Sequence, residues 1–278
     1  MTESYLLLGR DISRSPTPRM MNAAFEELGL DAIYSASNVE ANELGSAFAR
    51  MSEAQISGAN VTIPYKTAIV RFLNSLNEAS SRIGAVNTVK REGESYRGYN
   101  TDVDGIVKPL ESRKRSRPRR AFVIGTGGAA RAFCEAMHQL GCGELVALSR
   151  SPRKASDFLE AMKAAFPEIE LEVAPADAPP SGGPDLVFNA SPAGANGVAL
   201  PRGTKQILEG RPIVFDAVYL PVKTELIVAA EKLGCETIYG HEMLLAQAVG
   251  ALKIWTGRDA PVETMKKSLL NSLGVQRG

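Results

Sequence analysis

The chain has 278 residues and a mass of 29.7 kDa, a length that predicts two domains at about 150 residues each. Hydrophobic residues make up 44% and charged residues 23% of the chain, which excludes a disordered or low-complexity protein. No apolar run approaches the ~20 residues that span a bilayer, and the N-terminal segment lacks the pattern of a secretory signal. We therefore expect a cytoplasmic protein that does not enter a membrane.

Charge and cysteine content narrow the class further. The 32 basic and 31 acidic residues leave a net charge of +1, which is too balanced for a general polyanion binder. The basic segment 113–120 contains six cations and no interleaved aromatic residue, a composition more typical of a solvated linker than of a nucleic-acid site. Three cysteines without C-x-x-C spacing and only two histidines predict reduced thiols and no metal site.

The first third of the chain alternates short apolar runs with segments of helical periodicity. This alternation predicts a βαβαβα unit with a mostly parallel sheet, followed by two short strands. The expected strands are 5–9, 32–37, 56–61, 85–89 and 95–99, and the expected helices are 16–28, 40–51 and 64–73.

After the basic segment, the pattern of strands and helices restarts. Short, strongly apolar strands are typical of a buried parallel sheet, so we expect a second α/β lobe, with residues 174–184 as a loop inside it. Its expected strands are 121–125, 145–149, 185–189 and 213–216, and its expected helices end at residue 140 and span 152–166. The tail, 241–273, is predicted to be helical, with a break at Gly257 and a restart at Pro261.

The clearest motif is the glycine-rich stretch GTGGAA between an expected strand and an expected helix. Glycines there let the backbone approach a diphosphate at the helix N-terminus, although such a turn can also serve only to pack the helix closely. The strand before it and the helix after it favour dinucleotide binding. The residues concerned are Gly125, Thr126, Gly127, Gly128, Ala129 and Ala130.

The end of the next strand indicates which dinucleotide is bound. An NAD site usually offers a carboxylate about 20 residues further on, but here the strand ends in Ser149, Arg150 and Ser151, followed by Lys154. Cations and hydroxyl donors suit a 2′-phosphate. The alternative is a helix-capping serine followed by surface charges. We predict NADP in preference to NAD.

Lys66 is a candidate for acid–base chemistry. It falls in the first turn of the helix expected at 64–73, where the macrodipole disfavours a cation and promotes proton release, as a general acid and base requires. The alternative is a surface lysine whose stem lies along the protein.

A competing Y-x-x-x-K pattern at 219–223 contains Pro221. Proline there excludes the helix on which short-chain dehydrogenases carry their tyrosine and lysine on one face.

Other polar residues stand where a ligand could be held. Ser15 and Thr17 lie where a helix is expected to begin, and they either cap it or help to hold a carboxylate. Asp102 follows an asparagine and a threonine at the junction of the expected lobes, where such residues grip a polyhydroxylated ring or simply form turns. Gln247 interrupts an apolar helix, and a buried amide needs partners from the protein or from a ligand.

Taken in order, these segments resemble the shikimate dehydrogenase family across almost the whole chain. The motifs that carry the resemblance are the first-lobe segment that ends at Asn22, NVTIPYK at 60–66, GAVNT at 84–88, GYNTDVDG at 98–105, GTGGAARA at 125–132, NASPAG at 189–194, DAVYLP at 216–221, and the helix from Gln247 to Gly257. Several independent motifs in the family's order are specific, so the chain is identified as a member of this family.

The resemblance implies an α/β fold with two lobes: a mostly parallel substrate-binding catalytic lobe at 1–104, completed by helices at 239–278, and a Rossmann-like NADP-binding lobe at 105–238. It implies NADP-dependent, reversible reduction of 3-dehydroshikimate to shikimate, which serves chorismate and aromatic amino-acid biosynthesis. The implied enzyme is a cytoplasmic monomer or homodimer that uses a small-molecule substrate and needs no metal, nucleic acid or membrane.

The resemblance also implies roles for individual residues. Lys66 would donate and accept the proton, with Asp102 as its hydrogen-bonded partner at the reacting hydroxyl. The substrate would be held by Ser15, Thr17, Asn60, Thr62, Lys66, Asn87, Asp102, Tyr219 and Gln247. The cofactor would be held by Gly125, Thr126, Gly127, Gly128, Ala129, Ala130, Ser149, Arg150, Ser151, Lys154, Ser191, Val218 and Gly240.

Several positions depart from the family pattern. Asp11, Arg14 and Met21 replace a proline and two histidines, Thr17 replaces a serine, as in members that use quinate, and Ser149 replaces an asparagine common in NADP-dependent members. One alternative is therefore a quinate/shikimate dehydrogenase that uses NAD or NADP. An alternative of another class is a non-catalytic NADP-binding sensor that contacts nucleic acid through the basic segment.

Overall fold

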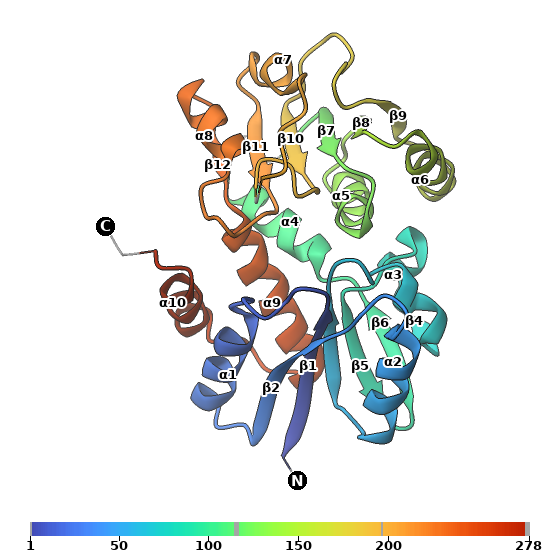
Figure 1. The fold of residues 1–278 in the computed structure, drawn as a ribbon, viewed down its shortest axis with the longest axis vertical. Coiled ribbons are helices and arrows are strands. Elements are labelled where there is room, and N and C mark those ends of the chain that lie inside the picture. Colours follow the sequence, from blue (N-terminus) through green and yellow to red (C-terminus); the bar gives the residue numbers. More distant parts are fainter. Residues whose placement is uncertain (1, 114–116, 196, 276–278) are drawn as a thin grey trace. The chain divides into compact units, whose positions relative to one another are not determined.

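The chain folds into two compact α/β units (Figure 1). A computed structural model describes residues 2–113, 117–195 and 197–275. The first unit comprises Met1–Thr101 and Gln247–Gly278, and the second comprises Asp102–Ala246; the resemblance implied boundaries after residue 104 and before residue 239. Each unit contains a six-stranded sheet, which confirms the expected α/β class.

The sheet of the first unit is parallel in one half and largely antiparallel in the other. Its strand order is β2-β1-β3-β5-β6-β4; β1 pairs in parallel with β2 and β3, whereas β5 runs antiparallel to β3 and β6, and β4 is parallel to β6. The strands are β1 (Glu3–Gly9), β2 (Ala32–Asn38), β3 (Gly58–Val61), β4 (Ser75–Leu76), β5 (Thr88–Glu92) and β6 (Ser95–Tyr99).

Helices of the first unit bury apolar side chains against this sheet. On α1, Met20, Met21, Ala24 and Phe25 are buried, and the Tyr5 ring of β1 packs against Phe25 with a centroid separation of 5.2 Å. The helices are α1 (Thr17–Glu27), α2 (Leu44–Glu53), the 3-10 helix η1 (Ala68–Phe72), α3 (Glu78–Ile83), α9 (Gly240–Thr256) and α10 (Val262–Ser272). The unit boundary before Gln247 falls within α9.

The α-helix expected at 64–73 is wrong. Lys66 lies in a turn, and only η1 follows it. The Lys66 carbonyl, which would accept a bond from residue 70 in an α-helix, instead accepts the Val86 N–H at 2.7 Å. Long-range pairing therefore takes the place of the helix, and Lys66 does not lie in the first turn of an α-helix, where a helix dipole would act on it.

The second unit has a fully parallel sheet in the order β12-β11-β10-β7-β8-β9. Its strands are β7 (Arg120–Ile124), β8 (Glu144–Ser149), β9 (Glu170–Pro175), β10 (Leu186–Asn189), β11 (Ile213–Asp216) and β12 (Thr237–Ile238). Its helices are α4 (Asp102–Glu111), α5 (Gly128–Gln139), α6 (Pro152–Ala165), α7 (Thr204–Leu208) and α8 (Glu225–Lys232).

Strand order in the second unit creates a point where the chain changes direction. From β7 the chain proceeds through β8 to β9 on one side, and then returns to β10 and β11 on the other side of β7. In parallel sheets, ligands bind at the carboxyl ends of the strands beside such a switch point. The central strands are buried on both faces, since the consecutive residues Phe122 and Val123 of β7, and Val187 and Phe188 of β10, are all fully inaccessible to solvent, as the apolar runs predicted.

The loop expected at 174–184 starts later than predicted, because β9 ends at Pro175. This strand alternates exposed and buried side chains at the edge of the sheet, so it lacks the continuous apolar run of the central strands.

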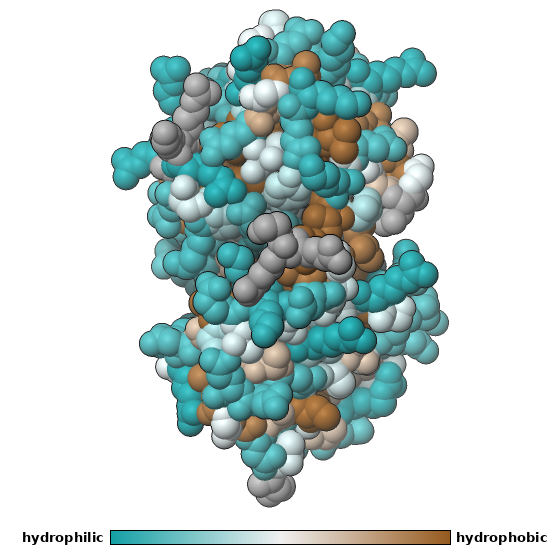
Figure 2. Space-filling view, turned by 90° about the vertical axis from the view of Figure 1, so that its left-hand side faces the viewer, coloured by the Kyte–Doolittle hydropathy of each residue, from teal (hydrophilic) through white to brown (hydrophobic). Residues whose placement is uncertain are grey.

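No helix in the described residues combines the length and apolarity needed to cross a membrane. Hydrophilic side chains cover much of the face drawn in Figure 2, with apolar ones scattered among them.

Candidate active site

The carboxyl edge of the first sheet brings together predicted substrate residues. Leu8 of β1 pairs with Val61 of β3 in parallel, so the segments that follow both strands leave from the same edge. A Cβ on Gly9 would overlap the Thr62 side chain, and glycine therefore lets these two segments approach closely. Asn60 and Thr62 come from the end of β3, and Ser15 with Thr17 follows β1.

Ser15 and Thr17 form a hydroxyl pair at the start of α1. Ser15 Oγ lies 3.1 Å from Thr17 Oγ1 and accepts the Thr17 N–H at 3.3 Å. Pro16 occupies the N-cap position and has no side-chain cap hydrogen bond, so Ser15 serves as the local acceptor from outside the helix. A helix N-terminus with adjacent hydroxyls suits an anionic group.

Three predicted residues lie in one buried polar network. Asn60 Nδ2 donates to the Asn87 carbonyl at 3.2 Å, and Asn87 Nδ2 donates to Gln247 Oε1 at 3.3 Å. All three side chains are buried. Gln247 interrupts the apolar surface of α9 because its amide has this partner, 160 residues away in the sequence.

Three hydroxyls that sequence analysis did not select hold this network. Tyr34 Oη donates to Asn60 Oδ1 at 2.8 Å, Thr88 Oγ1 accepts from Asn60 Nδ2 at 3.0 Å, and Thr101 Oγ1 accepts from Asn87 Nδ2 at 3.1 Å. Burial raises the pKa of Tyr34 well above its usual value, so its hydroxyl remains a donor. Both threonines belong to family motifs, whereas no sequence signal distinguishes Tyr34 from a core tyrosine.

Lys66, Asp102 and Tyr219 come from different segments of the two units. Lys66 is half-buried, and its carbonyl bonds to Val86, the neighbour of Asn87. Asp102 is buried as the first residue of α4, directly after Thr101. Tyr219 follows β11 and is half-buried. Lys66 belongs to the first unit, whereas Asp102 and Tyr219 belong to the second.

The glycine-rich turn of the second unit has the geometry of a dinucleotide loop. Gly125 has a φ of +112°, and a Cβ there would lie 3.3 Å from both the Ala190 carbonyl oxygen and Ser191 Cβ, so the position favours glycine on both counts. A Cβ on Gly127 would meet no atom within 4 Å. Gly127 is the N-cap residue of α5 and has no side chain to cap its first turn, so the N–H groups of that turn are suited to a diphosphate.

The end of β8 presents cations and hydroxyls. Ser149 Oγ accepts the Ser151 N–H at 3.2 Å, and Ser151 precedes α6 as its N-cap residue. Arg150 and Lys154 are exposed, and neither is ion-paired within the described part of the chain. This arrangement fits a 2′-phosphate, which needs cations free to approach it.

The remaining predicted cofactor residues lie at the same edge of the second sheet. Ser191 follows β10 and Val218 follows β11, and these strands are parallel neighbours with Asn189 opposite Asp216. A Cβ on Gly240, the first residue of α9, would overlap the Val218 backbone. The three residues are therefore grouped at the carboxyl edge that also carries the glycine-rich turn.

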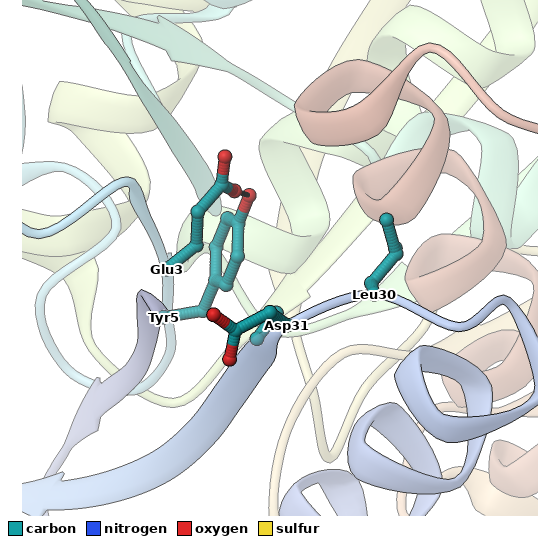
Figure 3. A pocket seen from close by; sticks show the side chains of 5 residues that line it. Glu3, Tyr5, Leu30 and Asp31 are labelled. Carbon is teal, nitrogen blue, oxygen red and sulfur yellow. Dashed lines mark hydrogen bonds between the residues drawn. The ribbon is translucent and has the colours of Figure 1, made fainter. Parts of the chain in front are cut away.

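A separate hollow lies at the opposite end of the first sheet. Glu3, Tyr5, Leu30 and Asp31 line it (Figure 3), and the Tyr5 hydroxyl donates to the Glu3 carboxylate. These residues stand at the amino ends of β1 and β2, whereas the predicted substrate residues follow the carboxyl ends. This hollow is therefore separate from the candidate site.

The structure also shows how the remaining sequence motifs are arranged. No helix forms at 219–223, so the Y-x-x-x-K pattern lacks its required geometry. In the basic segment, Arg113 bonds to Glu242 at 2.9 Å and Arg120 Nε lies 2.6 Å from Glu144 Oε1; residues 114 and 115 of that segment are outside the described residues. No cluster of three metal-ligating side chains occurs within 2–113, 117–195 and 197–275.

The cysteines are buried thiols. Burial raises the pKa of Cys142 to about 11 and raises that of Cys134 further. At neutral pH both are protonated, and a thiol is a weak nucleophile. They are therefore inert packing residues in this structure.

Known proteins resemble the chain along its length. The family profile of the shikimate dehydrogenase substrate binding domain matches residues 7–89, and that of the shikimate 5'-dehydrogenase C-terminal domain matches residues 240–270. The shikimate dehydrogenase (NADP(+)) of Moorella thermoacetica is 36% identical over 281 residues, which cover 98% of this chain and 94% of that protein.

Solved structures have the same fold. A crystal structure of a shikimate dehydrogenase in complex with NADP+ has a TM-score of 0.88 and 31% identity, over 99% of this chain and 96% of that one. A quinate dehydrogenase from Corynebacterium glutamicum in complex with NAD has a TM-score of 0.85 and 27% identity, over 97% and 99% of the two chains. The identity of 36% along nearly the whole of both sequences confirms the expected membership: the chain belongs to the shikimate dehydrogenase family.

Proposed function

We propose that this protein catalyses the reversible, NADP-dependent reduction of 3-dehydroshikimate to shikimate. The observation that carries the proposal is the second unit's carboxyl edge, where the open glycine-rich turn and the exposed Arg150 and Lys154 lie on the same parallel sheet. Family membership, with relatives that are NADP-dependent shikimate dehydrogenases, supports the same assignment.

In this proposal, one group of predicted residues binds the cofactor and another binds the substrate. The N–H groups of the first turn of α5 hold the diphosphate, and Arg150 with Lys154 holds the 2′-phosphate. When bound, NADP supplies or accepts the hydride. The hydroxyls of Ser15 and Thr17, with Tyr219, hold the substrate carboxylate, and the residues that hold the ring hydroxyls are Asn60, Thr62, Asn87 and Gln247.

Proton transfer is assigned to Lys66. Its Nζ donates a proton to the oxygen that develops negative charge during carbonyl reduction, and takes the proton back in the reverse reaction. Asp102 accepts a hydrogen bond at the same centre and orients the donor. The family motif NVTIPYK and the position of Lys66 beside the segment of Asn87 support this role.

We also propose that the enzyme acts in the cytoplasm on small molecules, as a monomer or homodimer, without nucleic acid. The net charge of +1 and the internal ion pairs of Arg113 and Arg120 support the view that the basic segment is a linker. A salt-sensitive nucleic-acid complex in a binding assay would contradict this part of the proposal.

The direct test is an assay of the purified protein with shikimate and quinate, each with NADP and with NAD. We expect the highest kcat/KM with shikimate and NADP. Thr17 and Ser149 make the comparison informative, since each differs from the residue usual in the family. A higher kcat/KM with quinate and NAD contradicts the proposal.

A further inference from the structure

Asp216 is a fully buried carboxylate at the carboxyl end of β11. Its Oδ1 accepts the Val218 N–H and Asn189 Nδ2, both at 3.0 Å, and its Oδ2 accepts the Thr224 hydroxyl at 2.6 Å. Burial raises the pKa of Asp216 to about 6, against these three hydrogen bonds, which lower it. At neutral pH the group is therefore a carboxylate with three donors directed at it, and the proposed chemistry does not use it.

Asn189 extends this network into the segment that follows β10. Its Oδ1 accepts the Ser191 N–H at 3.1 Å and the Ser191 hydroxyl at 2.8 Å. Its Nδ2 also donates to the Ala193 carbonyl at 2.9 Å. The Asn189 amide is fully buried, and each of its hydrogen-bonding atoms is used to hold this loop or to reach Asp216.

We propose that Asp216, with Asn189 and Thr224, is a positioning group that orders two cofactor-binding loops, the one after β10 that carries Ser191 and the one after β11 that carries Val218. The inference rests on the proposed function, because Ser191 and Val218 are among the residues that the family resemblance assigns to NADP. The proposed role of these three residues is to position the loops, and no contact with the reacting atoms is assigned to them.

The surroundings of the two loops explain why their positions matter. A Cβ on Gly125 would lie 3.3 Å from Ser191 Cβ, so the first loop runs close to the backbone of the glycine-rich turn. The Val218 backbone is packed against Gly240 in the same way. Ordering these loops before the cofactor arrives reduces the entropy lost on binding.

A carboxylate suits this position because all of its neighbours are donors. One charged group accepts from a backbone N–H, an amide and a hydroxyl, whereas a neutral amide at residue 216 would direct its own N–H groups at the Thr224 hydroxyl. Removing a partner leaves part of a buried charge unsatisfied, which is costly. Thr224 is also the N-cap of α8, since its Oγ1 accepts the Ile227 N–H at 3.2 Å.

The test uses substitutions at Thr224 in the full-length enzyme. Thr224→Val keeps the volume and removes the hydroxyl, whereas Thr224→Ser keeps the hydroxyl. The matched control is Thr204→Val, since Thr204 is a buried threonine of the same unit that donates to the Pro201 carbonyl at 2.6 Å and has no side-chain bond to the described residues of either loop. The measurements are the Kd for NADPH from its fluorescence, kcat and KM, and amide hydrogen exchange in both loops.

We expect Thr224→Val to raise the Kd for NADPH about tenfold, the size of one lost buried hydrogen bond to a charged group, and to speed exchange in both loops. Its kcat at saturating NADPH should stay close to wild type, while Thr224→Ser and Thr204→Val should bind NADPH normally. An unchanged Kd and unchanged exchange in Thr224→Val, or an equal loss in Thr224→Ser, overturns the inference.

A second variant keeps the inference testable if Thr224→Val does not fold. Asp216→Asn keeps the shape, retains the cap of α8 and should likewise raise the Kd for NADPH and speed exchange in the two loops; unchanged values overturn the inference. Loop exchange separates the two proposals. If wild-type protein does not bind NADPH but Asp216→Asn still loosens both loops, the positioning role stands and the proposed function fails.

Discussion

The two units bury polar groups at the carboxyl edges of their sheets in different ways. In the first unit the buried network is neutral, built from hydroxyls and amides: Tyr34, Asn60, Asn87, Thr88, Thr101 and Gln247. In the second unit the network centres on one carboxylate, Asp216, with Asn189 and Thr224 around it. The first orients side chains that would face a ring of hydroxyls, and the second orders backbone loops.

The two kinds of network differ in how their contribution to stability depends on pH. A neutral network spreads its hydrogen bonds over many pairs of groups, so loss of one hydroxyl costs about 1–3 kcal/mol of stability. The contribution of the neutral network to stability does not change near neutral pH. A buried carboxylate concentrates several bonds on one atom pair and carries a desolvation cost that protonation relieves. The second unit should therefore be the more sensitive to pH, and the first should contain the residue whose loss most affects the chemical step.

The largest effect expected is that of Lys66→Ala in the first unit. Loss of the proton donor should lower kcat by about 10²–10⁴-fold, while the Kd for NADPH stays at the wild-type value because cofactor residues lie in the second unit. Steady-state kinetics and fluorescence titration measure the two quantities. Lys253→Ala, which removes an exposed lysine paired with Asp259, is the control and should retain full activity. A wild-type kcat in Lys66→Ala rejects the assigned role.

The next effect concerns the pH dependence of stability through Asp216. Because its pKa is raised from 3.8 to about 6 in the folded protein, the folded state binds this proton more tightly than the unfolded state does. Its stabilising contribution is complete below pH 3.8 and is lost as the pH rises to about 6, a change of about 3 kcal/mol.

Asp216→Asn removes this titration. The difference in unfolding free energy, wild type minus Asp216→Asn, should therefore fall between pH 4 and 6.5 in urea denaturation series. Asp185→Asn, at an exposed carboxylate of the same unit, provides the matched control for a removed charge. A difference that is flat or rises over that range would show that Asp216 is not the buried titrating group of the second unit.

A smaller effect is expected at the end of β8. Arg150→Ala should raise the Kd for NADP about 10–100-fold, because one or two charge-assisted hydrogen bonds to the phosphate are lost. The Kd for NAD should stay within about twofold of the wild-type value. The neighbouring exposed Arg153, replaced in Arg153→Ala, serves as control. Equal losses for the two cofactors would remove the 2′-phosphate assignment.

The smallest expected effect comes from a substitution that tests whether the buried hydrogen-bond network of the first unit is uncharged. Tyr34→Phe removes the donor to Asn60 Oδ1, and should lower kcat/KM for shikimate about 3–10-fold, equivalent to roughly 1 kcal/mol. The ratio of mutant to wild type should be the same at pH 6 and pH 9, since the raised pKa of Tyr34 keeps it protonated. Tyr96→Phe, which loses a bond to the Ile56 carbonyl in the same unit, should leave kcat/KM unchanged. A ratio that varies with pH contradicts a neutral network.

Much of the fold could be predicted from local sequence patterns. The central strands are continuous apolar runs, so β7, β10 and β11 were located closely, and glycines at residues 125 and 127 marked the turn between β7 and α5. Edge elements were missed, since β9 alternates in polarity and β4 has only two residues. The α-helix expected around Lys66 was wrong because its carbonyl pairs with Val86 instead.

The candidate site could be predicted only in part. Residues in family motifs, such as Asn60, Asn87 and Gln247, were named from the sequence, and the structure places these three in one network. Tyr34 and Thr224 were missed because a buried tyrosine and a helix-capping threonine are common in any fold. Their importance appears only when the partner atom of each hydroxyl is known.

The sequence by itself determined the two α/β units, the glycine-rich turn and the positions where cations follow β8, because each depends on backbone preferences and hydrophobic periodicity within a few residues. Only the tertiary structure decided the partners of buried polar groups. Asn87 and Gln247 meet across 160 residues, and a buried amide or carboxylate must be satisfied by whichever donors the fold brings within 3 Å or so. That pairing is set by strand order and register, which local patterns do not contain.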